Sequence, residues 1–103
     1  MKMGNINNIL NKVKNLQIEI DTHCRNLLGI LKEKYPVGFN KSEDLSMDIG
    51  DVWYDDEKGV LVWFKGDSES RKSKVNATLL ASDVLALHNE GRLNYDNIIL
   101  YSI

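Results

Sequence analysis

The strongest constraint on the fold is an apolar stripe that runs through the first third of the chain. Its members recur at three- and four-residue spacing, at Ile6, Ile9, Leu10, Val13, Leu16, Ile20, Leu27, Ile30 and Leu31. This spacing predicts one amphipathic helix over residues 5–34. Pro36 should end the helix, because it biases Tyr35 away from helical backbone angles.

The predicted helix is too long to be covered by its own domain. About 30 residues form a helix of about 45 Å. A compact chain of 103 residues has a diameter of roughly 35 Å. We therefore expect either a break near Gly29 or a projecting end, with a frayed first turn as the alternative. A projecting end would expose Ile6, Ile9, Leu10 and Val13, which form a candidate oligomerisation surface.

The rest of the chain predicts short strands and one short helix. Residues 45–55 and 59–65 read as a hairpin whose turn ends in Gly59. We expect a third strand over residues 72–79, although residues 75–81 also fit one helical face. A helix should follow from Ser82, a suitable N-cap, to just before Gly91. Residues 97–103 (NIILYSI) read as a buried strand.

This order, α-β-β-β-α-β, predicts a single two-layer α+β domain over residues 1–103. The long N-terminal helix (residues 1–36) should pack on an antiparallel sheet of about four strands. Residues 37–103 should supply the hairpin, the third strand, the short helix and the C-terminal strand. The short helix is expected to cover part of the second sheet face.

Charge is unevenly distributed along the chain. The net charge is −2, but residues 43–69 hold nine carboxylates against two lysines, a net charge of −7. Such a block repels nucleic acid and attracts basic surfaces. We therefore expect a protein partner with a basic surface and no direct nucleic-acid binding.

Cysteine content and hydropathy bear on the compartment. A single cysteine, Cys24, cannot form an internal disulfide. No run approaches the ~18 apolar residues of a membrane span, and the N-terminus is too polar for a signal peptide. These features favour a cytoplasmic protein without membrane association.

No catalytic, metal or cofactor motif is present. His23 and Cys24 are adjacent on the helix and point about 100° apart, which favours a half-buried histidine and a small core cysteine over a catalytic pair. Asp55, Asp56 and Glu57 lack the spacing of a calcium loop. We expect no cofactor, no metal and no catalytic site. A small enzyme that uses His88 or His23 with a carboxylate is an alternative.

The hairpin carries apolar residues on both faces. Simple alternation puts Trp53 with Leu45, Met47 and Ile49, and puts Val52 with Tyr54 on the opposite face. In the second strand, alternation separates Val60, Val62 and Phe64 from Leu61 and Trp63. A sheet covered by helices on one side needs only one apolar face. Either the short helix covers the second face, or that face binds another molecule.

The sequence therefore favours a small non-enzymatic binding or inhibitor protein. It would dock through an acidic and aromatic hairpin surface on a basic, nucleic-acid-processing protein. Bacteriocin immunity proteins and phage anti-defence inhibitors act in this physical style, although no motif links the chain to either. The candidate partner-binding residues are Asp51, Trp53, Tyr54, Asp55, Asp56, Glu57 and Trp63. The alternative is a homo-oligomeric accessory protein, such as a homodimer, assembled through the N-terminal helix.

Overall fold

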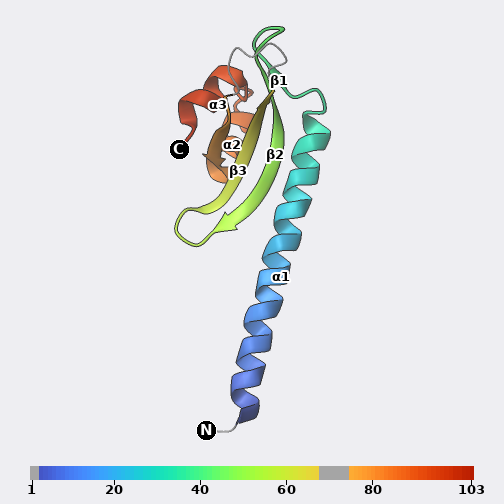
Figure 1. Ribbon diagram of the computed structural model, residues 1–103, viewed down its shortest axis with the longest axis vertical. Coiled ribbons are helices and arrows are strands. Elements are labelled where there is room, and N and C mark those ends of the chain that lie inside the picture. Colours follow the sequence, from blue (N-terminus) through green and yellow to red (C-terminus); the bar gives the residue numbers. More distant parts are fainter. Residues whose placement is uncertain (1–2, 68–74) are drawn as a thin grey trace.

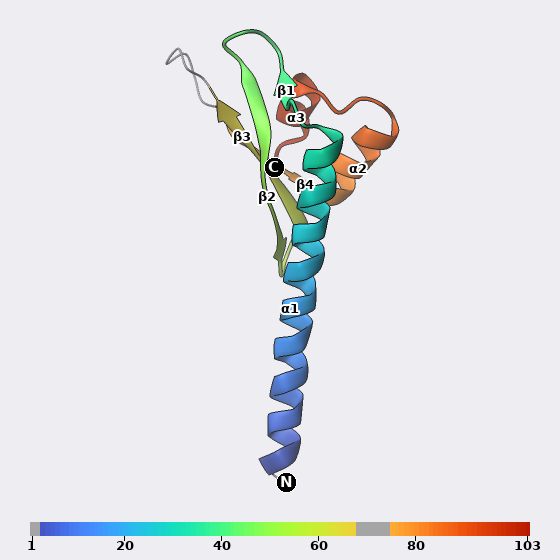
Figure 2. The same cartoon turned by 90° about the vertical axis from the view of Figure 1, so that its right-hand side faces the viewer.

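An antiparallel sheet forms one layer of the protein, and helices packed on one of its faces form the other (Figures 1 and 2). The computed structural model describes residues 3–67 and 75–103. In chain order the elements are α1 (Met3–Lys34), β1 (Phe39–Asn40), β2 (Ser46–Asp55), β3 (Gly59–Asp67), β4 (Ala77–Leu80), α2 (Ala81–Asn89) and α3 (Tyr95–Tyr101). The strands lie in the order β1-β2-β3-β4, each antiparallel to its neighbour. The predicted α+β fold, with a long helix and a sheet of four strands, is confirmed.

Helix α1 projects beyond the sheet without a break. The molecule measures 62 × 31 × 23 Å, and in Figure 1 the N-terminal half of α1 accounts for the extra length. Gly29 does not interrupt the helix. The helix ends before Pro36, as predicted, and Gly38 follows with φ of 70°, a conformation that favours glycine. In the described part of the chain, no helix is both long enough and apolar enough to cross a bilayer.

One hydrophobic core lies between the sheet and the helices. The C-terminal half of α1 contributes Cys24 and Leu31, and α2 contributes Val84 and Leu87. The other buried members are Phe39, Met47, Ile49, Val52, Val62, Phe64, Ala77, Leu79, Tyr95 and Ile98. All the described helices thus pack on the same face of the sheet, because α2 and α3 share a core with α1. The prediction that the short helix covers the second face is wrong.

The C-terminal segment is a helix, which corrects the predicted strand over residues 97–103. Asn94 caps α3, since its side-chain Oδ1 accepts a hydrogen bond of 2.9 Å from the Asn97 N–H. Tyr95 and Ile98 are buried whereas Leu100 is exposed, a helical rather than an alternating pattern. The fourth strand is instead the short β1, which lies between α1 and the hairpin, where no strand was predicted. The element order therefore differs from the predicted α-β-β-β-α-β.

The third strand and the short helix are confirmed in type, and residues 75–81 are mostly strand. Strand β4 passes directly into α2 at Ala81, and Gly91 adopts φ of 68° after the helix, as predicted. The N-cap is Leu80 rather than Ser82, and no side chain caps the helix. The start of α2 is set by the end of the β3–β4 ladder, which pairs Leu61 with Leu80. Residues 72–74 of the predicted strand lie outside the described residues.

Removal of the α3 cap should destabilise the fold. The substitution Asn94→Ala deletes the acceptor of the Asn97 N–H, and we expect the free energy of unfolding to fall by about 0.5–2 kcal/mol. Urea denaturation followed by circular dichroism measures this change. Asn94→Ser, which keeps an acceptor oxygen, should remain close to wild type. Equal stability of Asn94→Ala and the wild type would contradict the capping role.

Candidate functional site

The sheet has one face that no described helix covers, here called the open face. Cross-strand partners share a face of an antiparallel sheet. The pairing Val52–Val62–Leu79 belongs to the core, so the adjacent rows Trp53–Leu61–Leu80 and Asp51–Trp63–Thr78 lie on the open face. Asp48 and Lys65 form a further pair on this face. Figure 1 looks onto the open face, and the turned view in Figure 2 shows the helices behind it.

A bulge at Gly50 decides which aromatic residues reach the open face. The β2–β3 register shifts between Ile49 and Asp51. A glycine inside a strand often marks such a bulge or a close approach. A Cβ atom at Gly50 would lie 2.5 Å from Cε3 of Trp63 and 2.8 Å from its Cζ3. The indole ring of Trp63 therefore lies directly against the Gly50 backbone.

The bulge corrects the face assignment made by simple alternation. The extra residue moves Val52 and Tyr54 onto the core face, where Val52 pairs with Val62. It also moves Trp53 to the open face, away from Met47 and Ile49. Simple alternation failed because one residue of shift exchanges the two faces beyond the bulge.

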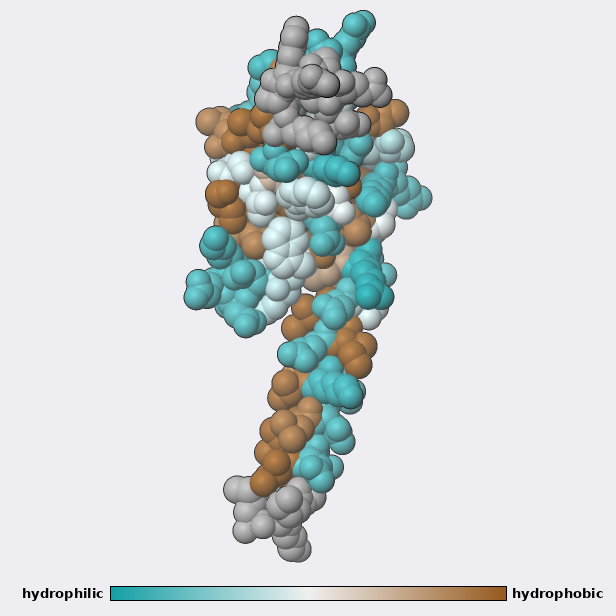
Figure 3. Space-filling view, in the orientation of Figure 1, coloured by the Kyte–Doolittle hydropathy of each residue, from teal (hydrophilic) through white to brown (hydrophobic). Residues whose placement is uncertain are grey.

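Both tryptophans are half-buried, although no described element packs above them. Leu61 lies between them on the open face and is only 4% exposed. Its neighbours on that face are Trp53, Trp63 and Leu80, so these side chains must shield it. The two indoles thus cover the middle of the sheet while part of each ring meets solvent. In Figure 3 the surface over the middle of the sheet is pale, of intermediate hydropathy, with teal hydrophilic residues above it and at its lower left and brown apolar residues at its sides.

Carboxylates border the tryptophans. Asp51 is exposed opposite Trp63, and Asp48 is exposed further along the face, where its side chain lies against Gly38. Asp55, Asp56 and Glu57 follow at the tip of the hairpin. The ion pairs found in the described residues, Lys41–Asp96 and Arg92–Glu90, involve none of these five acids. The acids therefore present negative charge that no described basic side chain neutralises within hydrogen-bonding distance.

The hairpin turn fixes the position of Asp55. Its Oδ1 accepts hydrogen bonds from the N–H groups of Glu57, at 2.8 Å, and of Lys58, at 2.9 Å. Backbone donation from Lys58 and then Glu57 lowers the pKa of this carboxyl below its ordinary value of 3.8. Gly59 completes the turn with φ of 89°. Asp55 thus carries its charge at the rim and shapes the tip of the hairpin.

The structure brings together most, but not all, of the predicted partner-binding residues. Asp51, Trp53 and Trp63 lie on the open face, with Asp55 at its end and Asp56 and Glu57 in the turn. Tyr54 lies on the other face, beside Val60, and helps to line a hollow of about 320 Å³ against α1. Sequence reasoning missed Asp48, Leu61, Thr78 and Leu80 as members of the open face. The glycine at position 50 was the signal that could have revealed the bulge.

The predicted oligomerisation residues also lie at the surface. Ile6, Ile9, Leu10 and Val13 are between 39% and 61% exposed on the projecting half of α1. Figure 3 shows an apolar band along one side of this segment, the side that lies below the hairpin.

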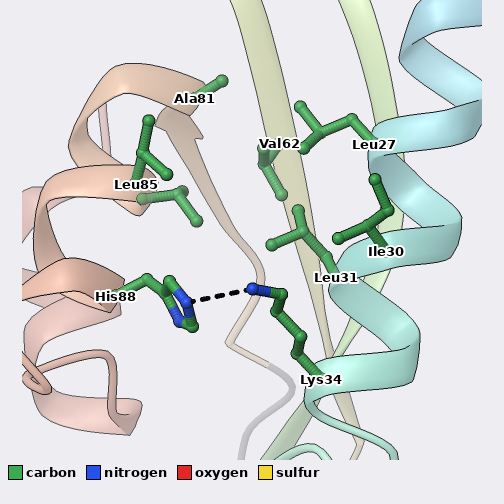
Figure 4. Close-up of a pocket in the computed structure, with 9 residues that line it drawn as sticks. Leu27, Ile30, Leu31, Lys34, Val62, Ala81, Leu85 and His88 are labelled. Carbon is green, nitrogen blue, oxygen red and sulfur yellow. Dashed lines mark hydrogen bonds between the residues drawn. The ribbon is translucent and has the colours of Figure 1, made fainter.

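His88 and Cys24, two of the residues considered for catalysis, occupy structural positions. His88 of α2 faces Lys34 at the end of α1, with its Nε2 3.5 Å from the Lys34 Nζ (Figure 4). Its Nδ1 is hydrogen-bonded to the hydroxyl of Tyr35, the residue that follows α1. The adjacent cavity of about 70 Å³ is lined otherwise by aliphatic side chains and contains no carboxylate or nucleophile. Burial, with help from Asp21 and Asp51, raises the pKa of the Cys24 thiol and disfavours the reactive thiolate.

His23 and Cys24 diverge, as predicted from their adjacency on a helix. Cys24 is a core residue, as expected, but His23 is exposed rather than half-buried. Among the described residues, no group of three or more His, Cys, Asp or Glu side chains is arranged to hold a metal ion.

Comparisons of the chain with protein-family models, with curated proteins and with solved structures found no match. What the protein binds is therefore inferred from the geometry and chemistry of its own surfaces.

The contact between Gly50 and Trp63 can be tested by adding one methyl group. Gly50→Ala should force the indole outward and lower the free energy of unfolding by about 1–3 kcal/mol. In a Trp53→Phe background, Trp63 is the sole tryptophan, and its emission should shift to the red. Gly29→Ala is the matched control, because nothing lies within 4 Å of its added Cβ. This control should stabilise α1 by about 0.5–1 kcal/mol. Unchanged emission and stability in Gly50→Ala would contradict the packing.

The turn carboxylate should contribute a pH-dependent stability. Because the folded pKa of Asp55 is lowered, its contribution is present above pH 3.8, the ordinary pKa, and is lost as the pH falls through the folded pKa. Nuclear magnetic resonance titration of the Asp55 carboxyl should give a midpoint below 3.8. Asp55→Asn keeps the acceptor oxygen but removes the carboxyl group that titrates. The free energy of unfolding of this variant should therefore vary less with pH in this acidic range than that of the wild type. A midpoint above 3.8 would refute the assignment.

Proposed function

We propose that the protein binds a basic protein surface through the open face of its sheet. The observation that carries the proposal is the pair of half-buried tryptophans, Trp53 and Trp63, on a sheet face without a described cover. Tryptophan is enriched among residues that dominate binding energy at protein interfaces. Here each indole already has a fixed position against the sheet, so little side-chain entropy is lost on binding.

The rim of acids selects the charge of the partner. Asp48, Asp51, Asp55, Asp56 and Glu57 lie beside or beyond the indoles, and Lys65 is the basic residue paired opposite Asp48. A partner with lysine and arginine side chains around an apolar centre would complement this pattern and would be attracted over a distance of about 10 Å at moderate salt.

The kind of partner follows from the same chemistry. Proteins that handle nucleic acids expose basic surfaces that bind phosphates. Carboxylates at the spacing of the open-face rim can occupy such a surface, and the tryptophans can anchor the complex. An inhibitor or immunity protein that acts in the cytoplasm on a nucleic-acid-processing enzyme is the specific form of the proposal.

The test compares capture of partners by immobilised full-length variants from a lysate of the source cells. Trp63→Ala should weaken binding of a specific partner by about 2 kcal/mol, or about thirtyfold. The triple variant Asp51→Asn, Asp56→Asn, Glu57→Gln should weaken it most at low salt. A second experiment then measures the affinity of the purified partner and its salt dependence by titration calorimetry.

Matched controls separate the proposed face from general effects of charge or hydrophobicity. Leu100→Ala removes a side chain that is 72% exposed on α3, away from the open face. Glu33→Gln, Glu43→Gln, Asp44→Asn removes three exposed acids elsewhere. Both controls should bind like the wild type. A set of captured proteins that is identical for the site and control variants would sink the proposal.

A further inference from the structure

The projecting half of α1 carries an apolar stripe with nothing packed against it in the described structure. Ile9 is 61% exposed, Leu10 60% and Leu16 56%. The segment is also rich in asparagine, a weak helix former, at positions 5, 7, 8, 11 and 15. An isolated helix of about a dozen residues is marginal in water even with good helix formers. The packed C-terminal half spares this part of α1 the cost of nucleation, so a packing partner would stabilise the helix here rather than create it.

The stripe repeats every seven residues. Ile6, Val13, Ile20 and Leu27 fall on one line along α1, with Ile9 and Leu16 three residues after the first two. An apolar residue every seven positions, with a second apolar residue three positions later, is the pattern of a helix that pairs with another helix. The line continues directly into the face of α1 that packs against the sheet, since Ile20 and Leu27 border the core. The sheet covers the C-terminal half of this face, and no described element covers the N-terminal half.

We propose that the projecting segment, residues 6–16, pairs antiparallel with the same segment of a second copy of this chain. A second copy is a suitable occupant, because its own stripe is apolar and helical and has the same length and period. The two segments overlap over about 11 residues, or about 16 Å of helix. Contacts repeat about a twofold axis, as in most homodimers.

The position of the sheet decides the orientation. The hairpin tip meets α1 near Gln17, Ile20 and Asp21, which line a hollow together with Tyr54 and Asp56. Above this level, the sheet occupies the side of α1 that carries the stripe (Figures 1 and 2). In a parallel pair, both sheets would need the same space between the two helices. In an antiparallel pair, the N-terminus of each α1 lies where the other copy's sheet begins. The two sheets then lie at opposite ends of the dimer.

Charge complementarity supports the same orientation. The antiparallel pair brings the N-terminus of one α1 toward the hairpin turn of the other copy, which carries Asp55, Asp56 and Glu57. A helix N-terminus bears a partial positive charge, and the first turn of α1 contains no acidic residue to offset it. The acidic turn would therefore stabilise the N-terminus of the second copy. The stripe and the two tryptophans of the open face are separate surfaces, and the acidic turn lies between them. The dimer presents one open face at each end.

The oligomeric state is tested by sedimentation equilibrium of the full chain over a wide concentration range. The wild type should be a dimer that dissociates on dilution, with a parallel loss of helicity in circular dichroism. Leu16→Lys should weaken dimerisation by at least about a hundredfold, because the change enters the interface twice. Ile18→Lys is the matched control, since Ile18 is also 56% exposed but lies off the stripe. It should dimerise like the wild type. A wild type that stays monomeric throughout, or equal effects of the two variants, would overturn the proposal.

Disulfide trapping tests the orientation. In a Cys24→Ala background, Ile6→Cys and Leu16→Cys chains are mixed and oxidised. The antiparallel pair should give mainly the mixed disulfide between positions 6 and 16. Predominant disulfides between two copies of position 6 would show a parallel pair and overturn the antiparallel arrangement. Thermal unfolding of each variant verifies that the sheet domain remains folded.

Discussion

The continuous apolar face of α1 is the constraint on which the rest of the structure depends. Its upper half closes the core through Cys24 and Leu31, and without that contact the sheet would lose a large part of its cover. The same face continues below the hairpin, where the sheet ends. A straight helix cannot point these additional apolar side chains toward the core, because side chains keep a fixed period about the helix axis. The C-terminal half of this face therefore becomes part of the core. The N-terminal half, which extends past the sheet, becomes the exposed stripe.

The second consequence is a sheet with one covered face. Strand β4 runs directly into α2, and α2 and α3 both contribute to the core beside α1. The remaining face is shielded by its own side chains, with the indoles of Trp53 and Trp63 around Leu61. The residues that shield this face are also the residues that the proposed partner would contact. Binding would complete the burial of rings whose positions the fold has already set.

The residues with the most obvious chemistry serve packing instead. His88 joins α2 to α1 through Tyr35 and Lys34, and Cys24 is a small core residue with a raised pKa. Neither lies on the open face. The proposed function therefore rests on a surface rather than on reactive groups, through the arrangement of aromatic and acidic side chains across strands.

The sequence by itself determined the elements whose signals are local. Periodicity over some 30 residues defined α1, Pro36 placed its end, and alternation with Gly59 defined the hairpin. The α3 helix was missed because six apolar or small residues at a chain end read equally well as a strand, and the Asn94 cap was the only distinguishing signal. Which face each tryptophan occupies was beyond simple alternation, because the bulge at Gly50 exchanges the faces. Only the tertiary structure decided that every described helix packs on one side of the sheet, and that half of α1 extends past it. Both outcomes depend on contacts between residues far apart in the chain, for which the sequence carries no local signal.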